Sequence, residues 1–216
     1  MMNKIIVFTM LLAFLSCQEK SKNESRVDRL PFYNEETFTP HWFANDNEMS
    51  NSFHKISPFS FQNQDGEVLT QETFVGKIYV TDFFFTSCGG ICPKMTSNMK
   101  LLQDEFIDDD KILLLSHSVT PDRDSVSVLK AYAKTQEIIS GKWHLVTGSK
   151  EEIYKLGRKD YFVEEDLGVD KDNDDFLHTE NFVLIDKNSH IRGIYNGLNK
   201  TSVNQLIIDI HTLKKE

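Results

Sequence analysis

Basic residues are scarce in this sequence, and so are cysteines. Lys and Arg number 24 against 33 Asp and Glu, which gives a formal net charge of −9 over 216 residues. Because a nucleic-acid partner requires a basic face, this balance excludes nucleic acid as an expected partner. Hydrophobic residues make up 39% of the chain, and this length and composition fit one packed domain with short appendages.

The apolar run at the N-terminus is too short to span a membrane. It covers residues 5–15, whereas a spanning helix needs ~20 residues, so it predicts the hydrophobic region of a signal peptide. A Cys two positions behind this run resembles a bacterial lipoprotein processing site, although Phe14 and Leu15 replace the residues usual there. We therefore expect a lipidated Cys17; the alternative is an ordinary signal peptide that contains a Cys. A diacylated Cys is a firm two-chain membrane anchor.

These features divide the chain into three expected parts. Residues 1–16 form a lipoprotein-type signal peptide, residues 17–52 a lipidated Cys with a polar tether, and residues 53–216 one domain. The tether keeps the domain off the membrane, and aromatic side chains such as Phe32 suggest that part of it docks on the domain. The protein is therefore expected in the cell envelope, exported and anchored by its lipid on the periplasmic side.

Strand-like and helix-like segments alternate from residue 53 onward. Runs rich in β-branched and aromatic residues predict strands, and apolar residues at helical spacing predict helices. The predicted strands are residues 59–61, 78–85, 112–116, 143–146, 181–185 and 190–195, and the predicted helices are 93–106, 124–134, 203–213 and one that opens at Ser149. This order is typical of an α/β domain with a mixed central sheet flanked by helices. A cysteine pair that follows the first long strand and opens the next helix is the arrangement of a thioredoxin-like fold.

Two cysteines, Cys88 and Cys92, remain once Cys17 is lipidated. In an exported protein such a pair is structural, redox-active or metal-binding. A structural disulfide is disfavoured, because so short a loop constrains the unfolded chain very little. Residues four apart on a helical turn share one face with Cβ atoms ~5–6 Å apart, and a helix N-terminus favours thiolate over thiol.

Two thiolates at this spacing either oxidise to a disulfide or chelate a soft ion. Cu(I) suits two thiolates with room for one more ligand, whereas zinc requires four ligands. His178 is the candidate third ligand, because it lies in the segment before the strand at 181–185, which faces the dithiol in a thioredoxin-like fold. His117 is an alternative accessory ligand. Met95 and Met99 lie at helical spacing behind the site and are interpreted as core residues.

Four motifs together resemble the SCO/SenC family over residues 53–213. The family pattern is C-x-x-x-C-P, then D-P-x-x-D, W-x-x-L-T-G and F-L-H-T/S, and its counterparts here are residues 88–93, 120–124, 143–148 and 176–179. Thr120 replaces the first Asp of the second motif, and Val146 replaces the Leu of the third. Family members bind copper through the two cysteines and the distal histidine, and they help to assemble the dinuclear copper centre of cytochrome c oxidase.

The resemblance implies that Cys88, Cys92 and His178 hold copper as Cu(I) or Cu(II). Its implied partner is subunit II of cytochrome c oxidase or a similar copper-site protein. Two functions remain open on the same cysteines: a copper chaperone, and a thiol–disulfide reductase that keeps the copper-site cysteines of the oxidase reduced. A peroxidase is disfavoured, because the Thr-x-x-Cys spacing is absent at Cys88. The acidic run 170–175 fails the EF-hand pattern and is interpreted as a solvated loop.

Overall fold

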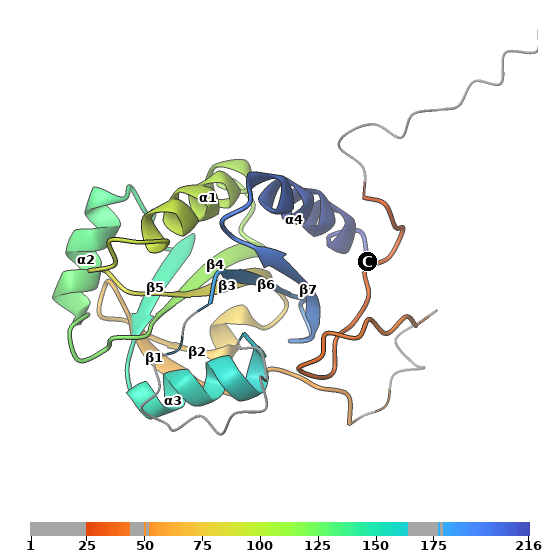
Figure 1. Cartoon of the computed structure of the whole chain (residues 1–216), viewed down its shortest axis with the longest axis horizontal. Coiled ribbons are helices and arrows are strands. Elements are labelled where there is room, and N and C mark those ends of the chain that lie inside the picture. The colour runs from red at the N-terminus through yellow and green to blue at the C-terminus, as the bar shows by residue number, and fades with distance from the viewer. Residues whose placement is uncertain (1–24, 44–49, 51, 164–176, 178) are drawn as a thin grey trace, which may run out of the picture.

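A mixed seven-stranded sheet forms the centre of the protein (Figure 1). The computed structural model describes residues 25–43, 50, 52–163, 177 and 179–216. The strands are β1 (Ser60–Asn63), β2 (Val68–Thr70), β3 (Ile78–Phe84), β4 (Ile112–Ser118), β5 (Trp143–Thr147), β6 (Asn181–Ile185) and β7 (Ile191–Asn196). Their order is β2-β1-β5-β4-β3-β6-β7, and the β3–β4 and β4–β5 pairs are parallel while the others are antiparallel.

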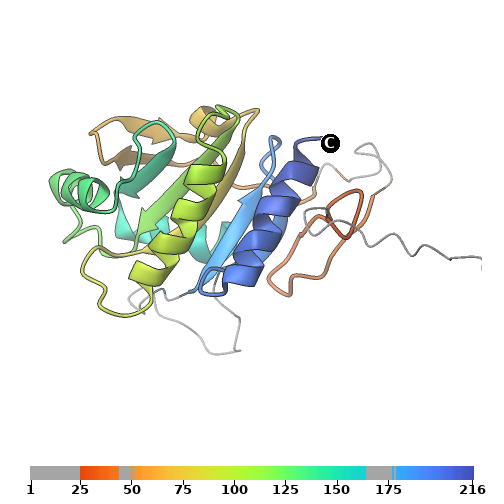
Figure 2. The ribbon, with the colours of Figure 1, turned by 90° about the horizontal axis from the view of Figure 1, so that it is seen from above.

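Helices cover both faces of this sheet. They are α1 (Cys92–Glu105), α2 (Val126–Thr135), α3 (Lys150–Lys155) and α4 (Lys200–Leu213), with a short helical turn η2 (Gln71–Phe74) and a π-helical turn η3 (Leu156–Asp160). Figures 1 and 2 show α1 and α4 side by side over one face, and Figure 1 shows α3 on the other. The predicted mixed sheet flanked by helices is confirmed. No helix in the described part of the chain is long and apolar enough to cross a membrane.

The central strands are buried on both faces because their sequences are almost continuously apolar. Alternate side chains divide between two cores, since successive residues of a strand point to opposite faces. On β3, Val80 and Phe84 pack beneath α1 and α4, whereas Tyr79 and Phe83 join the core on the other face with Leu156 of η3. The dithiol and its surroundings are therefore built on the face that α1 covers.

The N-terminal segment 25–43 packs against the domain, as its aromatic residues suggested. Tyr33 forms an isolated bridge with Ile191 of the edge strand β7, and Phe32 is 2% exposed. Trp42, in contrast, is 55% exposed. Part of the segment expected to be a tether therefore contributes to the core.

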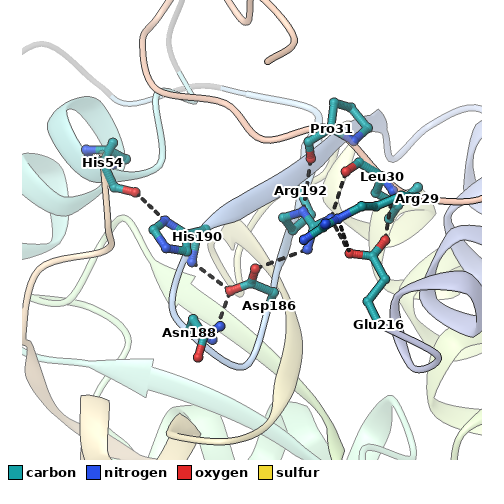
Figure 3. Close-up of polar contacts among 9 residues, drawn as sticks. All are labelled: Arg29, Leu30, Pro31, His54, Asp186, Asn188, His190, Arg192 and Glu216. Carbon is teal, nitrogen blue, oxygen red and sulfur yellow. Dashed lines mark hydrogen bonds and ion pairs between the residues drawn. The ribbon is translucent and has the colours of Figure 1, made fainter. Parts of the chain in front are cut away.

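A buried arginine holds this segment in place (Figure 3). Arg192 of β7 is 3% exposed and donates hydrogen bonds to the carbonyl oxygens of Pro31 (3.0 Å) and Leu30 (2.7 Å). It also pairs with the carboxylates of Asp186 (3.2 Å) and Glu216 (2.5 Å). We call these five residues the arginine clamp; it joins the N-terminal segment, the β6–β7 turn and the C-terminal residue.

The clamp lies at the end of the sheet where β3 begins. Tyr79, near the start of β3, pairs with Ile185, the last residue of β6, and Asp186 follows directly. Cys88 follows the other end of β3. The arginine clamp and the dithiol therefore occupy opposite ends of the central sheet.

Candidate metal centre

The two cysteines lie between β3 and α1. β3 ends at Phe84, the loop 85–91 carries Cys88, and Cys92 is the first residue of α1. Cys92 is 4% exposed and belongs to the core beneath α1, whereas Cys88 is partly exposed, and both thiols are free. Pro93 follows at a position where its missing N–H costs no helical hydrogen bond. The predicted placement of the cysteines, after a buried strand and at the start of a helix, is confirmed.

The environment of Cys88 stabilises its thiolate. Burial raises the pKa of the Cys88 thiol, but hydrogen bonds from the Cys92 thiol and from the backbone N–H groups of Cys92, Gly90 and Ile91 lower it, and the net direction is down. These amides belong to the first turn of α1 and the loop before it, where backbone N–H groups have no helical acceptor. Cys88 is therefore the more reactive and more accessible sulfur of the pair.

The environment of Cys92 has the opposite effect. Burial is the largest cause that raises the pKa of its thiol, followed by the hydrogen bond with Cys88 and the negative charges of Cys88 and Asp82. The pair thus combines an exposed thiolate with a buried thiol that keeps its proton until a cation or a disulfide bond replaces it. This arrangement supports either a soft-metal site or a reversible disulfide.

The loop that carries Cys88 is tied to the rest of the domain through Asp124. Thr86 donates to the Asp124 carboxylate from its backbone N–H (3.1 Å) and from its hydroxyl (2.5 Å). Ser118 and Thr120 donate to the same carboxylate at 2.6 and 3.1 Å. The sequence motif at 120–124 signalled this residue, but it gave no role for the carboxylate.

His178 lies outside the described residues, as do the acidic run 170–175 and Phe176. Leu177 is 1% exposed and belongs to the core on the face of the sheet opposite α1. It packs so close to Gly157 of η3 that a Cβ added there would lie 2.8 Å from it. Because β6 runs antiparallel to β3, with Thr81 paired to Val183, the chain enters β6 at the sheet end that carries the dithiol.

The structure does not bring His117 to the cysteines. It is fully buried in the core on the opposite face of the sheet, where its ring stacks on Phe83 with centroids 4.9 Å apart. Neither ring nitrogen has a hydrogen-bond partner, and burial lowers the pKa of His117 to about 3. Met95 and Met99 are 0% exposed, so their interpretation as core residues is confirmed.

Other histidines with described contacts also lie away from the dithiol. His144 contacts Asn63 at 3.5 Å, and His190 contacts the backbone carbonyl of His54 at 2.8 Å. In the part of the chain that the structure describes, no three His, Cys, Asp or Glu side chains gather in a way that suits a metal ion. The described donor set is therefore the cysteine pair alone, which fits a soft ion and leaves coordination positions for ligands from elsewhere.

Comparison with known proteins gives consistent matches over most of the chain. The SCO1/SenC family model matches residues 47–215. A SCO1/SenC family lipoprotein from Bacillus anthracis str. Ames is 32% identical, with a TM-score of 0.65, and the match covers 74% of this chain and 95% of that one. BsSco, described as a member of the Sco family of cytochrome c oxidase assembly proteins with a disulfide switch, is 30% identical with a TM-score of 0.62, covering 74% and 93%.

A copper-bound structure is also among the similar proteins. Yeast Sco1 with copper bound is 24% identical and has a TM-score of 0.56, with 73% of this chain and 89% of that one covered. At this identity the match shows the shared fold alone. The thioredoxin-like fold inferred from the position of the cysteines is confirmed by the matches to the Bacillus anthracis lipoprotein and BsSco. The match across residues 47–215, together with the 32% identical relative, shows that this chain belongs to the SCO1/SenC family.

Proposed function

We propose that this protein is a membrane-tethered copper chaperone. It binds copper at Cys88 and Cys92 and delivers it for assembly of the dinuclear copper centre of cytochrome c oxidase, with subunit II or a similar copper-site protein as recipient. The observation that carries the proposal is the free cysteine pair, in which Cys88 is partly exposed and its thiolate is favoured. An acceptor thiol can approach Cys88 from solvent while the buried Cys92 still holds the ion.

The relatives support both halves of this proposal. Copper occupies the yeast Sco1 structure, and BsSco is described as a cytochrome c oxidase assembly protein. The chemistry of the pair supports copper over zinc, because two thiolates satisfy Cu(I) with at most one more ligand, whereas a closed zinc site takes four. Copper loading replaces protons on the sulfurs, so it depends on pH.

His178 is the proposed third ligand. Its neighbour Leu177 is buried, and the chain enters β6 at the dithiol end of the sheet. A neutral imidazole adds affinity and suits Cu(II), which prefers nitrogen donors more than Cu(I) does. Because this ligand comes from a different segment than the cysteines, it can leave during transfer while the two sulfurs keep the ion.

Metal analysis of cysteine variants tests the chaperone. We expect one copper per reduced domain in the wild type and none in Cys88→Ser, Cys92→Ser or the double variant. Copper should protect both thiols from alkylation, and oxidation should release it, since the same sulfurs cannot form a disulfide and bind metal. Equal copper content in the double variant would refute the dithiol site.

His178→Ala separates the proposed third ligand from the dithiol. We expect it to weaken copper binding by at least ~10-fold, the lower end of the effects seen when support of a metal site is lost. It should change the Cu(II) absorption spectrum and leave exchange with a test disulfide unchanged. His144→Ala and His190→Ala are the matched controls and should change neither. Wild-type affinity and spectrum in His178→Ala would reject the three-ligand site.

A thiol–disulfide reductase is the second candidate, because the two thiols differ in the way that this chemistry uses. The Cys88 thiolate attacks a substrate disulfide, and Cys92 then displaces the second substrate thiol, so one disulfide is exchanged for another. The disulfide switch described for BsSco supports this candidate. Full exchange activity in His178→Ala combined with unchanged copper binding would favour the reductase over the chaperone.

The tether is proposed to begin at a lipidated Cys17, which lies outside the described residues. The similarity to a Bacillus anthracis lipoprotein supports a lipid anchor. Mass spectrometry of the native N-terminus tests it: a diacylated Cys17 is expected as the first residue. An intact Met1, or an unmodified N-terminus beyond Cys17, would contradict it.

A further inference from the structure

We infer that Asp124 is a positioning residue for the dithiol: its carboxylate holds the loop that carries Cys88 in register with Cys92. The inference rests on the proposed function, since it concerns the same two sulfurs. Asp124 lies in the loop between β4 and α2, distant in sequence from the cysteines, and it is 1% exposed.

Both carboxylate oxygens of Asp124 point at neighbouring donors. Oδ1 accepts from the Thr86 hydroxyl at 2.5 Å, and Oδ2 accepts from the Thr86 backbone N–H at 3.1 Å. Oδ2 also accepts from the hydroxyls of Ser118 (2.6 Å) and Thr120 (3.1 Å). Asp124 thus joins the end of β4, its own loop and the dithiol loop through a single side chain.

The two Thr86 bonds hold the dithiol loop to Asp124 just before its glycines. Val119 donates to the Phe84 carbonyl at 2.9 Å and so extends the β3–β4 pairing up to the loop. Beyond Thr86, the Cys88 N–H bonds locally to the Phe85 carbonyl at 3.3 Å, and a Cβ placed on Gly89 would meet nothing within 4 Å. Two bonds from Thr86 to Asp124 therefore set where this open stretch starts, two residues before Cys88.

A carboxylate suits this position better than any neutral side chain. It is an acceptor on both oxygens, with about four lone-pair sites, and here four donors converge on it. Its hydrogen bonds are charge-assisted and therefore shorter and stronger than neutral ones. No described ion pair joins Asp124 to a basic residue, so its charge is satisfied by hydroxyls and one amide, whose directions fix geometry.

Thr86 and Ser118 provide a matched pair of substitutions. Each donates one hydroxyl hydrogen bond to the Asp124 carboxylate, but only Thr86 belongs to the dithiol loop. Thr86→Val removes the hydroxyl with little change of shape and releases one of the two bonds that hold the loop. Ser118→Ala removes a hydroxyl from the same carboxylate and leaves the loop bonds intact. Thr86→Ser keeps the hydroxyl and tests for rescue.

The experiment measures Cu(I) affinity by competition with a chromophoric chelator, together with the thermal midpoint of each apo protein. We expect Thr86→Val to weaken Cu(I) binding by ~10-fold or more, as for residues that orient metal ligands. Ser118→Ala and Thr86→Ser should keep wild-type affinity, although Ser118→Ala lowers the thermal midpoint as much as Thr86→Val. If Thr86→Val does not fold, Thr86→Ala carries the same expectation.

The redox equilibrium of the same variants keeps this inference distinct from the proposed function. The protein dithiol and oxidised glutathione form the Cys88–Cys92 disulfide and two reduced glutathione molecules. A displaced loop disfavours ring closure, so Thr86→Val should shift this equilibrium ~10-fold toward the dithiol, about 30 mV. This readout applies even if the wild type binds no copper, which would reject the chaperone alone. Equal effects of Thr86→Val and Ser118→Ala, or no effect of Thr86→Val on either readout, would overturn the role of Asp124.

Discussion

The two ends of the central sheet are held together by different chemistry. At one end the arginine clamp pairs a buried guanidinium with two carboxylates and two backbone carbonyls. At the other end Asp124 gathers hydroxyls and one amide beside a loop with an exposed Gly89-Gly90 stretch. The arginine clamp holds three segments together that are distant in the sequence. The Asp124 contacts position one short loop, whose glycines stay exposed to solvent.

The two ends of the sheet therefore differ in what their contacts contribute. A buried ion pair is costly to break, because removal of one partner leaves an uncompensated charge. The Asp124 carboxylate is buried as well, but two of its donor residues, Thr86 and Thr120, are only partly buried, so water can replace them when their bonds open. The clamp end therefore contributes mainly to the stability of the fold, whereas the contacts at the Asp124 end bear on the position of the sulfurs.

Loss of the clamp arginine should have the largest effect on stability. Arg192→Leu leaves the carboxylate of Asp186 buried without its partner, so we expect a loss of ~3–5 kcal/mol in the free energy of unfolding. Urea unfolding measures it. The exposed pair of His211 with Glu105 is the control, and His211→Ala should cost about 0–1 kcal/mol. Copper binding by folded Arg192→Leu should equal that of the wild type; weaker binding would show that the two ends are coupled.

Buried His117, at the same end of the sheet as the dithiol but on the opposite face, should make the stability of the protein depend on pH. Its pKa is about 3 in the folded protein because of burial, against ~6.5 in the unfolded chain. Above pH ~6.5 the His117 ring is neutral in both the folded and the unfolded state, so it does not lower the free energy of unfolding. As the pH falls from ~6.5 toward about 3, only the unfolded state binds the proton, and the free energy of unfolding decreases. Between pH 7 and pH 5 this loss amounts to about 2 kcal/mol.

His117→Leu should remove this pH dependence. Since both ring nitrogens lack partners, an apolar replacement leaves no buried polar group unsatisfied, and stability at pH 7 should be unchanged or higher. Urea unfolding of the wild type and the variant at pH 7 and pH 5 gives the difference, in which other titrating groups cancel. A constant difference between the two pH values would show that His117 takes up its proton in the folded state as readily as in the unfolded one.

The sequence predicted the scaffold of the site better than its supports. The buried strands at 78–85 and 112–116 and the helix behind Cys92 follow from apolar runs and helical spacing, which are local signals, and the structure confirms them with shifts of one or two residues. The short edge strand β2 was missed, since Val68–Thr70 is too brief to show alternation. Sequence position alone also left His117 as a possible ligand, because one residue decides which face of a strand a side chain occupies.

The clamp and the Asp124 contacts were beyond the reach of local patterns. Arg192 meets Leu30 across 162 positions, and Thr86 meets Asp124 across 38. Such pairs depend on topology, which places residues distant in sequence at one end of the sheet. An Asp or Arg in a sequence is usually solvated. The motif at 120–124 marked Asp124, but nothing near either residue in the sequence showed which distant groups it contacts.

Thr120→Val should have the smallest effect and refines the comparison within the dithiol end. Thr120 stands where the family motif has Asp, and its hydroxyl donates to Oδ2 of Asp124 at 3.1 Å. Since Thr120 is only partly buried, water can replace the lost donor, and we expect a cost of about 1 kcal/mol in unfolding free energy. The Thr86 bonds remain, so Cu(I) affinity should stay at the wild-type value, and Thr120→Ser should match the wild type in both measurements. If Thr120→Val weakens Cu(I) binding as much as Thr86→Val, the Thr86 bonds have no special role, and the assignment of Asp124 as the residue that positions the dithiol loop is rejected, as it would be by an equal effect of Ser118→Ala.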